Sequence, residues 1–412
     1  MAMAQLKQGT TAARVFGEIW HHGPLSRSEL VALTGLTKST VFQLTEDLQR
    51  DGLVVETGLR TSGSQGGRRA TLLQANPDAV RVVGVHLGGT RTSVAITDTF
   101  GRVLDARSRP TVRRRPDESV ARVAEMIGEL SAEHGAPSAV GVAVPGLIDR
   151  DTGLCLVAPN LGWRDVPVAT LIGEAVQAPT IALNTVQAMA VAEMAQLRPD
   201  ERMTLAMLYV GTGVGTALIT DGNLLRGARG LAGELGHLQV RDPGDPEAVK
   251  CACGRVGCLE SLVGADAIVR RATQRGIAAA GRRLTPELVG ELASDGDAAA
   301  RSLIQDIAVE MGEAAAALVQ LTNPDTVVVA GSVASMGDML LDPLRETVVR
   351  RTQPELRESL DVRRSLLDNQ GKLRGAITLA LQALGVPVRG LSGSAWRSQV
   401  LPVGEAAVAA GD

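Results

Sequence analysis

The first fifty residues alternate apolar and polar positions with the period of short helices. One apolar face recurs at helical spacing and is formed by Val15, Phe16, Ile19 and Trp20. The sequence His22-Gly23-Pro24 ends this pattern, Ser26 can cap a second helix, and Thr37 can cap a third. Gly35 lies between the last two helices, where a tight turn needs a permissive backbone. The pattern predicts three short helices joined by tight turns.

The third helix has an apolar side and a polar side. Its inward positions are Val41, Leu44 and Leu48. The polar positions near its N-terminal end are Lys38, Ser39, Thr40 and Gln43. Side chains of these types suit base edges and phosphates, as on a recognition helix that enters the major groove.

A basic hairpin follows the three helices. A strand begins at 53–56, a Gly/Ser-rich tip occupies 61–67, and a second strand at 71–73 follows Arg68 and Arg69. Residues 1–75 contain eight Lys and Arg against six Asp and Glu, a local charge of about +2. Three helices and a basic wing predict DNA binding. The alternative is a small helical interaction domain with a solvated basic loop.

Strands and glycine turns dominate the rest of the chain. Apolar strands at 82–86 and 92–96 flank the turn Leu87-Gly88-Gly89-Thr90, and strands at 205–209 and 216–219 flank Gly211–Gly215. A further strand at 326–330 runs into Gly331-Ser332. Such turns let backbone N–H groups approach a phosphate. The presence of two such glycine turns, in different parts of the chain, predicts two α/β lobes around a nucleotide-binding cleft. The long helical patterns at 120–130 and 299–321 are interpreted as structural.

Three of the four cysteines cluster within eight positions. Cys251, Cys253 and Cys258 follow His237 and complete the Cys₃His ligand set of a closed structural zinc site. The alternative is a group of buried free thiols, because cysteine packs as a small hydrophobe. Cys155, in an apolar run, is interpreted as a core thiol.

Composition narrows the classes of protein that the chain can belong to. The net charge of −3 over 412 residues excludes a polycation, so any nucleic-acid binding must be local. No run approaches the roughly 20 apolar residues that a membrane span requires. The N-terminus lacks the pattern of a signal peptide, and the few cysteines suit a reducing compartment. We therefore expect a cytoplasmic protein without a membrane segment.

These motifs together resemble the ROK family (repressor, open reading frame, kinase), in its branch with a fused DNA-binding domain, the xylose-repressor-like regulators. The motifs, in chain order, are Gly88-Gly89-Thr90, Val144-Pro145-Gly146, Asn160-Leu161-Gly162-Trp163, Gly211–Gly215, Glu234-Leu235-Gly236-His237 and the cysteine cluster up to Glu260. The resemblance implies an α/β chain: a winged helix-turn-helix followed by a two-lobed, actin-like fold of the sugar-kinase ATPase type. We expect the winged helix at 1–75, the first lobe at 76–190 and the second at 191–388. The C-terminal helix of the second lobe can return to the first, and the tail at 389–412 is expected to be disordered.

The resemblance also implies a sugar pocket between the lobes. Its contacts would be Asn160, Asn184, Glu234, His237 and Glu260, with His237 also on the zinc. Amides and carboxylates suit sugar hydroxyls because they are convergent donors and acceptors. From the residues alone, both asparagines read as ordinary loop residues, and Glu234 reads as a partner of the zinc-binding histidine.

Two positions depart from the kinases of the family. Thr185 stands where a kinase has the aspartate that takes the proton from the sugar hydroxyl, and His86 stands where an aspartate helps to hold Mg²⁺. A threonine hydroxyl is no base near pH 7, and imidazole is a poor ligand for Mg²⁺. We therefore expect a sugar-responsive transcriptional repressor with no catalytic residue, binding a palindromic operator as a homodimer or higher homo-oligomer. Two alternatives are an active ATP-dependent sugar kinase fused to a DNA-binding domain, and a regulator that answers to a protein partner.

Overall fold

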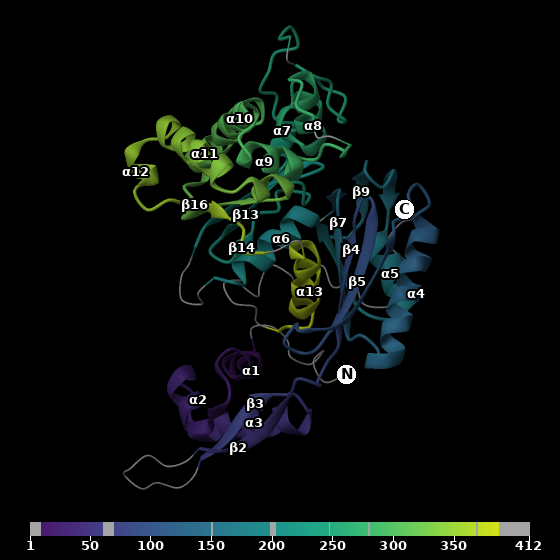
Figure 1. The fold of residues 1–412 in the computed structure, drawn as a ribbon. Coiled ribbons are helices and arrows are strands. Elements are labelled where there is room, and N and C mark those ends of the chain that lie inside the picture. Colours follow the sequence, from purple (N-terminus) through teal and green to yellow (C-terminus); the bar gives the residue numbers. More distant parts are fainter. Residues whose placement is uncertain are drawn as a thin grey trace. The chain divides into compact units, whose positions relative to one another are not determined.

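The computed structural model describes residues 10–60, 70–149, 151–197, 203–246, 248–278, 281–367 and 370–386 (Figure 1). The chain divides into two compact units, Met1–Pro199 with Lys372–Asp412, and Asp200–Gly371. The predicted wing tip with Arg68 and Arg69 lies outside the described residues, as does the tail at 389–412.

The N-terminal part is a helix-turn-helix with a small sheet, coloured purple in Figure 1. Its elements are α1 (Thr11–His22), β1 (Leu25–Ser26), α2 (Arg27–Thr34), α3 (Lys38–Arg50), β2 (Val54–Arg60) and β3 (Ala70–Ala75). Ser26 caps α2 in a capping box with Glu29, and the hydroxyl of Thr37 accepts from the N–H of Thr40 at the start of α3. Gly35 ends α2 with a φ of 67°, in the left-handed region that glycine adopts without strain. The three predicted helices and their caps are confirmed.

The first lobe is built on a five-stranded sheet. Its strands are β4 (Val82–Leu87), β5 (Arg91–Thr97), β6 (Val103–Pro110), β7 (Ala139–Val144) and β11 (Thr180–Asn184), in the order β11-β7-β4-β5-β6. Helices α4 (Pro116–His134) and α5 (Val168–Val176) share one apolar core with one face of the sheet. A smaller sheet contains β8 (Leu147–Ile148), β9 (Cys155–Ala158) and β10 (Trp163–Val166), and α6 (Thr185–Met194) directly follows β11.

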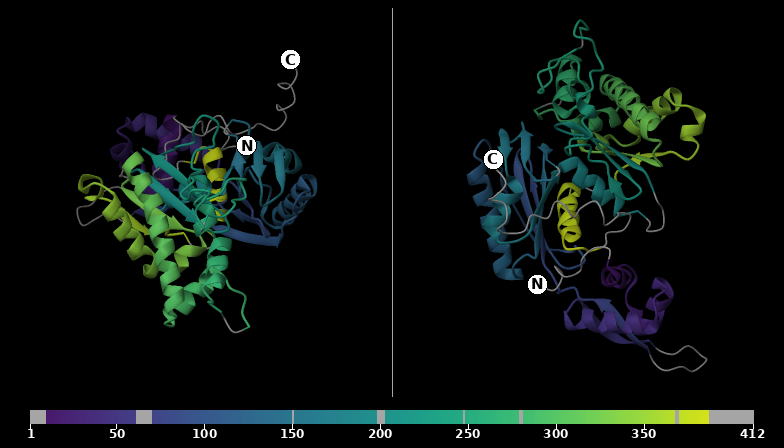
Figure 2. Two further views of the ribbon diagram at one scale, coloured as in Figure 1. Left: turned by 90° about the horizontal axis from the view of Figure 1, so that it is seen from above. Right: turned by 180° about the vertical axis from the view of Figure 1, so that it is seen from behind.

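The last helix, α13 (Gly371–Ala383), packs on the other face of this sheet, as the views of Figures 1 and 2 agree. A Cβ added to Gly84 of β4 would lie 2.6 Å from Ile377, and one added to Gly141 of β7 would lie 1.9 Å from the carbonyl oxygen of Ala376. The sheet therefore needs glycine at both positions so that α13 can approach it closely. Leu381 of α13 joins an apolar core that also contains Phe16 of α1, so one core serves the helix-turn-helix and the first lobe.

The second unit repeats the sheet of the first lobe. Its strands are β12 (Leu205–Val210), β13 (Val214–Thr220), β14 (Asn223–Leu224), β15 (Thr326–Ala330) and β16 (Asp361–Arg364), in the order β14-β13-β12-β15-β16. In both sheets the first three strands pair antiparallel in chain order, and the last two strands are added in parallel beside the first strand. The turns at Gly88-Gly89 and Gly211–Gly213 thus occupy equivalent hairpins of a repeated sheet.

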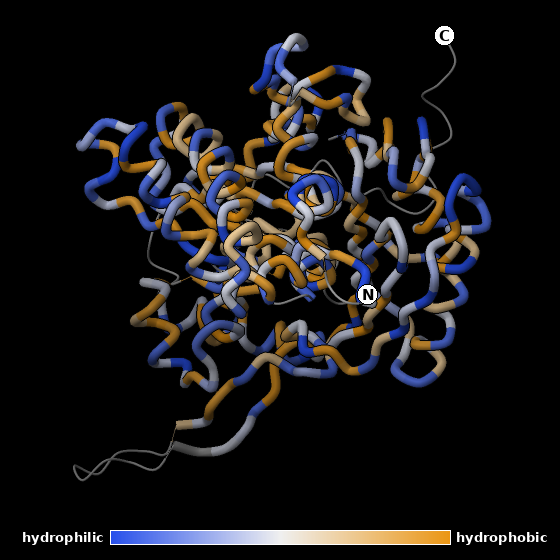
Figure 3. Tube along the Cα trace, turned by 45° about the horizontal axis from the view of Figure 1, so that its top comes forward, coloured by the Kyte–Doolittle hydropathy of each residue, from blue (hydrophilic) through white to orange (hydrophobic). Residues whose placement is uncertain are grey.

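Helices complete the second unit. They are η2 (Leu235–His237), α7 (Glu260–Val263), α8 (Ala265–Gln274), α9 (Pro286–Ser294), α10 (Ala298–Thr322), η3 (Ser332–Met336), α11 (Asp338–Arg351) and α12 (Pro354–Arg357). Along the helices, hydrophobic and hydrophilic positions alternate in Figure 3, as amphipathic helices on a sheet require. Among the described residues, no helix is both long and apolar enough to cross a membrane.

Candidate functional site

The structure brings together the four residues of the predicted metal site. The ligand atoms of His237, Cys251, Cys253 and Cys258 all lie within 4.8 Å of one another. Cys251 Sγ is 3.6 Å from His237 Nδ1, and Cys253 Sγ is 3.6 Å from Cys258 Sγ. Around a tetrahedral zinc with ordinary bond lengths, such ligand atoms are separated by roughly 3.6–3.8 Å. The donor set and its spacing therefore fit a tetrahedral ion.

The protein surroundings shift the pKa values of the cysteine thiols in opposite directions. Burial raises the pKa of the Cys251 thiol to about 12, whereas the backbone N–H of Arg255 lowers the pKa of the more exposed Cys253 to about 6. A bound divalent cation would stabilise every thiolate, including the buried one, and would release protons on binding.

Backbone contacts hold the cluster in place. Gln239 and Cys258 form an isolated antiparallel bridge, and Lys250 and Val256 form another across the loop between the cysteines. A Cβ added to Gly236 would lie 2.1 Å from the carbonyl oxygen of Val214 in β13. Only glycine at this position lets η2 carry His237 against the sheet, which explains the Gly-His pair of the motif.

Glu260, the first residue of α7, joins the cluster to the glycine turn. Its Oε2 accepts the backbone N–H of Val214 at 3.0 Å, and its Oε1 lies 3.6 Å from Cys251 Sγ. Glu234 Oε2 lies 3.7 Å from His237 Nε2, on the ring nitrogen opposite the cysteines. Loss of surrounding water raises the pKa of Glu234; His237 opposes the shift and Glu260 adds to it. Three predicted sugar contacts, Glu234, His237 and Glu260, therefore lie together in the second unit.

The other two predicted sugar contacts lie in the first unit and differ in their environment. Asn160 is exposed, with its Cβ close to Gly89 of the first glycine turn. Asn184 is the N-cap of α6: its Oδ1 accepts from Val186 at 2.8 Å and from Gln187 at 3.4 Å. Its Nδ2 donates to the carbonyl of Gly146 at 2.9 Å. Within the described part of the chain, one N–H of the Asn184 amide is thus left without an acceptor.

Of the two residues expected to replace the carboxylates of kinases, Thr185 is buried and His86 is half-buried. Thr185 is 6% exposed, and its Oγ1 has no hydrogen-bond partner among the described residues. His86, on β4, packs against its own turn, since a Cβ on Gly88 would lie 3.0 Å from its Cε1. Burial, helped by the charge of Lys372, lowers the pKa of His86 to about 3. Neither side chain carries a negative charge near neutral pH.

Four of the predicted DNA-reading residues, Lys38, Ser39, Thr40 and Gln43, lie in the first half of α3. Lys38, Ser39 and Gln43 are exposed, whereas Thr40 is half-buried. The hydroxyls of Ser39 and Thr40 lie 3.0 Å and 2.8 Å from that of the cap residue Thr37. Gln43 donates to Asp47, whose pKa is lowered by Arg50 and by Gln43.

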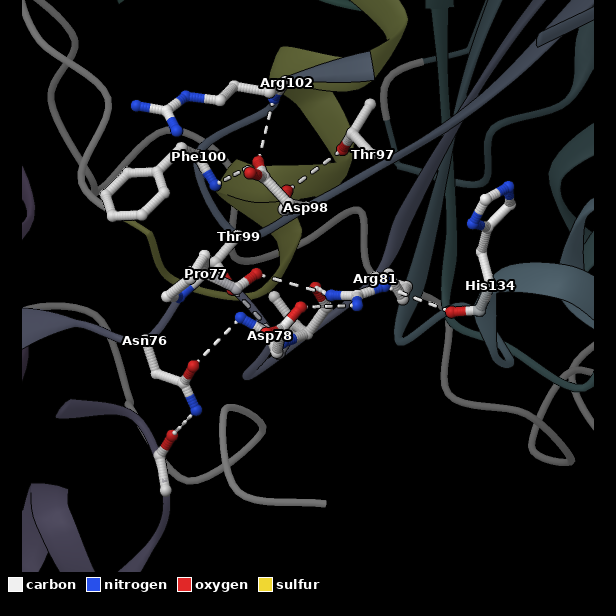
Figure 4. Close-up of polar contacts among 12 residues, drawn as sticks. Asn76, Pro77, Asp78, Arg81, Thr97, Asp98, Thr99, Phe100, Arg102 and His134 are labelled. Carbon is white, nitrogen blue, oxygen red and sulfur yellow. Dashed lines mark hydrogen bonds and ion pairs between the residues drawn. The ribbon is translucent and has the colours of Figure 1, made fainter. Parts of the chain in front are cut away.

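A hydrogen-bonded turn between β5 and β6 contacts the helix-turn-helix from the first lobe. One carboxylate oxygen of Asp98 accepts the N–H groups of Phe100 and Arg102, both at 2.9 Å (Figure 4). The turn presents its Thr99 carbonyl to the indole N–H of Trp20 at 3.1 Å, and the rings of Trp20 and Phe100 stack with centroids 6.0 Å apart. Trp20, on the predicted apolar face of α1, is partly buried and packs against the core that the helix-turn-helix shares with the first lobe.

The same junction contains the segment that leaves β3. Asn76 Nδ2 donates to the carbonyl of Gly52, and its Oδ1 accepts from Asp78 (Figure 4). Thr99 donates to the carbonyl of Pro77 from both its N–H and its hydroxyl. Gly101, in the same turn, lies over α13, where an added Cβ would be 3.2 Å from Leu381. Helix α13 also packs on α6, since a Cβ on Gly375 would lie 2.5 Å from the carbonyl of Ala188. Contacts thus run from α6 through α13 and the turn to α1.

Comparisons with known proteins match both parts of the chain. The ROK family model matches residues 82–383, and the model of the IclR helix-turn-helix domain matches residues 20–58. The chain is 29% identical over 371 residues to a xylose repressor of Caldicellulosiruptor bescii, covering 87% of this chain and 92% of that protein. It is 32% identical over 321 residues to a glucokinase of Halalkalibacterium halodurans, covering 73% of this chain and 94% of that protein.

Solved structures agree with these matches. A ROK family transcriptional regulator, described as a homolog of the E. coli Mlc protein, superimposes with a TM-score of 0.80 at 25% identity, covering 94% of this chain and 98% of that one. A ROK family glucokinase from Streptomyces griseus, in complex with glucose and AMPPNP, gives a TM-score of 0.65 at 28% identity, covering 73% of this chain and 99% of that one. The chain belongs to the ROK family and carries an N-terminal helix-turn-helix domain before its sugar-kinase-like domain.

Proposed function

We propose that this protein is a sugar-responsive transcriptional repressor whose kinase-like domain binds a sugar without phosphorylating it. One observation carries the proposal: a helix-turn-helix is joined to a sugar-kinase-like domain. Thr185, which is buried, is the residue we expect at the position of the proton acceptor of the kinases. The similarity to a xylose repressor over nearly its whole length supports the regulatory half. The similarity to glucokinases supports sugar binding.

Loss of phosphate transfer follows from the chemistry of two side chains. A threonine hydroxyl does not ionise near pH 7 and cannot take the proton of an attacking hydroxyl. The neutral imidazole of His86 supplies no carboxylate oxygen for Mg²⁺, a hard ion that prefers oxygen ligands. The sugar and zinc positions are retained while the proton-transfer and magnesium positions are lost, as suits a sensor.

The proposed sugar contacts are polar side chains that suit sugar hydroxyls: Asn160, Asn184, Glu234, His237 and Glu260. Zinc on His237, Cys251, Cys253 and Cys258 would act as a structural ion that holds His237 and orients the glutamates beside it.

DNA would be read by α3 and the wing. The expected contacts are Lys38, Ser39, Thr40, Gln43, Arg68 and Arg69. A homodimer would place two copies of α3 in successive major grooves of a palindromic operator. Sugar binding would act on α6, and the contacts through α13 and the Asp98–Arg102 turn would carry the change to α1. The protein would exist in two conformations that differ in operator affinity. The sugar can shift the equilibrium between them only if it binds one of the two more tightly than the other.

A sugar panel tests the proposal in two steps. Thermal-shift screening first identifies a sugar that raises the melting temperature, since binding stabilises by RT ln(1 + [L]/Kd). Gel-shift titration then measures operator affinity with and without that sugar. If none of the stabilising sugars changes the operator affinity, the claim that a sugar regulates DNA binding is wrong.

The rival function is an active ATP-dependent sugar kinase that also binds DNA, favoured by the glucokinase relatives. A coupled ADP-release assay on the wild type and on Thr185→Asp distinguishes the two. A sensor shows no turnover in the wild type, and any turnover appears only in Thr185→Asp. Turnover in the wild type at a rate typical of kinases, about 1–100 per second, establishes the rival.

A further inference from the structure

A large aromatic side chain lies exposed in the middle of the predicted DNA-reading face. Phe42 of α3 is 55% exposed, while Val41, Thr45 and Leu48 of the same helix are buried. The helical period places Phe42 on one face with Lys38, Ser39 and Gln43, all three expected to contact DNA. Phe42 was not among the DNA contacts expected from the sequence.

One arginine holds the Phe42 ring at the surface. The guanidinium carbon of Arg27 lies 5.1 Å from the ring centroid, within the range of a cation–π contact. The guanidinium is itself fixed, donating to Thr45 Oγ1 at 2.9 Å, to Glu46 Oε1 at 2.8 Å and to Gln49 Oε1 at 2.9 Å. The ring is therefore supported from its own domain, yet more than half of its surface remains open.

The charges around Phe42 are compatible with a nucleic-acid surface. The two acidic side chains of α3 are each paired with an arginine: Glu46 with Arg27 at 2.8 Å, and Asp47 with Arg50 at 2.7 Å. Lys38 adds an exposed cation one turn before Phe42. The face therefore combines a phosphate contact, polar groups for base edges and one apolar group.

An apolar group on such a face has one specific partner in the major groove. Thymine is the base that presents a methyl group there, and contact with a phenylalanine is one of the ways in which that methyl is read. We propose that Phe42 is a specificity-determining residue that contacts a thymine methyl group in each half of the operator. This inference rests on the proposed function, since it requires that α3 enter the major groove.

Replacement of single thymines by uracil tests the inference, because uracil lacks only that methyl group. The full-length protein first selects a duplex from a pool of random sequence. Each dT of that duplex is then replaced by dU, and affinity is measured by fluorescence anisotropy for the wild type, Phe42→Ala and Phe42→Leu. A buried methyl group contributes about 0.8 kcal/mol, so we expect about a fourfold loss at one thymine per half-site in the wild type. The loss should disappear in Phe42→Ala and persist in part in Phe42→Leu.

The controls distinguish a failure of the proposed role of Phe42 from a failure of the proposed DNA-binding function. Val103→Ala removes a comparably exposed apolar group from β6 and should leave every uracil effect unchanged. Equal uracil effects in the wild type and Phe42→Ala, or no uracil effect in either, overturn the role of Phe42 while DNA binding stands. If Phe42→Ala instead changes only self-association in sedimentation, the ring belongs to a protein interface and the inference is wrong. A wild type that selects no duplex refutes the proposed function itself.

Discussion

The indole N–H of Trp20 donates a hydrogen bond of 3.1 Å to the carbonyl of Thr99, and thereby joins α1 of the helix-turn-helix to a turn of the first lobe. The carboxylate of Asp98 fixes that turn, and Leu381 of α13 lies beneath it. The DNA-reading domain is thus anchored to the domain proposed to sense the sugar, rather than tethered by a flexible linker.

Trp20→Phe should weaken the coupling between sugar binding and DNA binding. It should affect the sugar affinity and the operator affinity, each measured alone, much less. The phenyl ring retains the apolar contact with Phe100, but the hydrogen bond to Thr99 is lost. One hydrogen bond contributes about 1 kcal/mol, so the sugar-induced change in operator affinity should shrink by up to roughly fivefold. Parallel titrations of sugar, of operator and of both together measure the coupling. A coupling equal to that of the wild type would show that the signal takes another route.

His86 should make the protein less stable in mild acid. Its pKa is about 6.5 in the unfolded chain and about 3 in the folded one, so the unfolded state binds more protons between these values. The free energy of unfolding therefore falls as pH drops below 6.5, by about 1–2 kcal/mol at pH 5, allowing for partial solvation of the ring. Urea unfolding at pH 7.5 and pH 5 measures the effect against His86→Gln, which does not titrate. Identical pH dependence in the two proteins would contradict the assigned shift.

Cys258→Ser should abolish zinc binding and destabilise the second unit. We expect one zinc per chain in the wild type and none in the variant, measured by plasma mass spectrometry. Because structural zinc contributes its binding energy to folding, the melting temperature should fall by roughly 5–10 °C. The matched control is Cys155→Ala, which removes the buried cysteine of β9 in the first unit and should keep the full zinc content. Zinc retained by Cys258→Ser, or lost from Cys155→Ala, would refute the ligand set.

Asn184 has a structural role that substitution can separate from ligand binding. Asn184→Ala removes the cap of α6 and should cost about 1 kcal/mol of stability. Asn184→Ser keeps a capping oxygen but lacks the amide N–H left for a sugar. We therefore expect Asn184→Ser to fold nearly as stably as the wild type while sugar affinity falls roughly fivefold, measured by calorimetry. Unchanged sugar affinity in Asn184→Ser would leave this residue as a cap alone.

Local patterns in the sequence predicted much of the fold. Ser26 and Thr37 cap their helices as expected because capping depends on the few residues that follow. The glycine turns fall between the expected strands because apolar runs on both sides mark them. The three cysteines and His237 come together because their loop is short and bridged.

Features that depend on distant contacts could not be predicted in this way. Trp20 fits the apolar face of α1, but its partner Thr99 lies 79 residues away. Gly84 and Gly141 make room for α13, a helix from the far end of the chain, and no local pattern reveals that need. The exposure of Phe42 depends on Arg27, which holds the ring from a different helix.

The most direct test of the account is the operator affinity of the full-length, zinc-loaded protein with and without a sugar that raises its melting temperature. Fluorescence anisotropy with the selected duplex gives both dissociation constants under the same salt conditions. A repressor that senses the sugar should bind the duplex at least fivefold more weakly when the sugar saturates it. Equal affinity in both conditions, with the sugar demonstrably bound, would contradict the account.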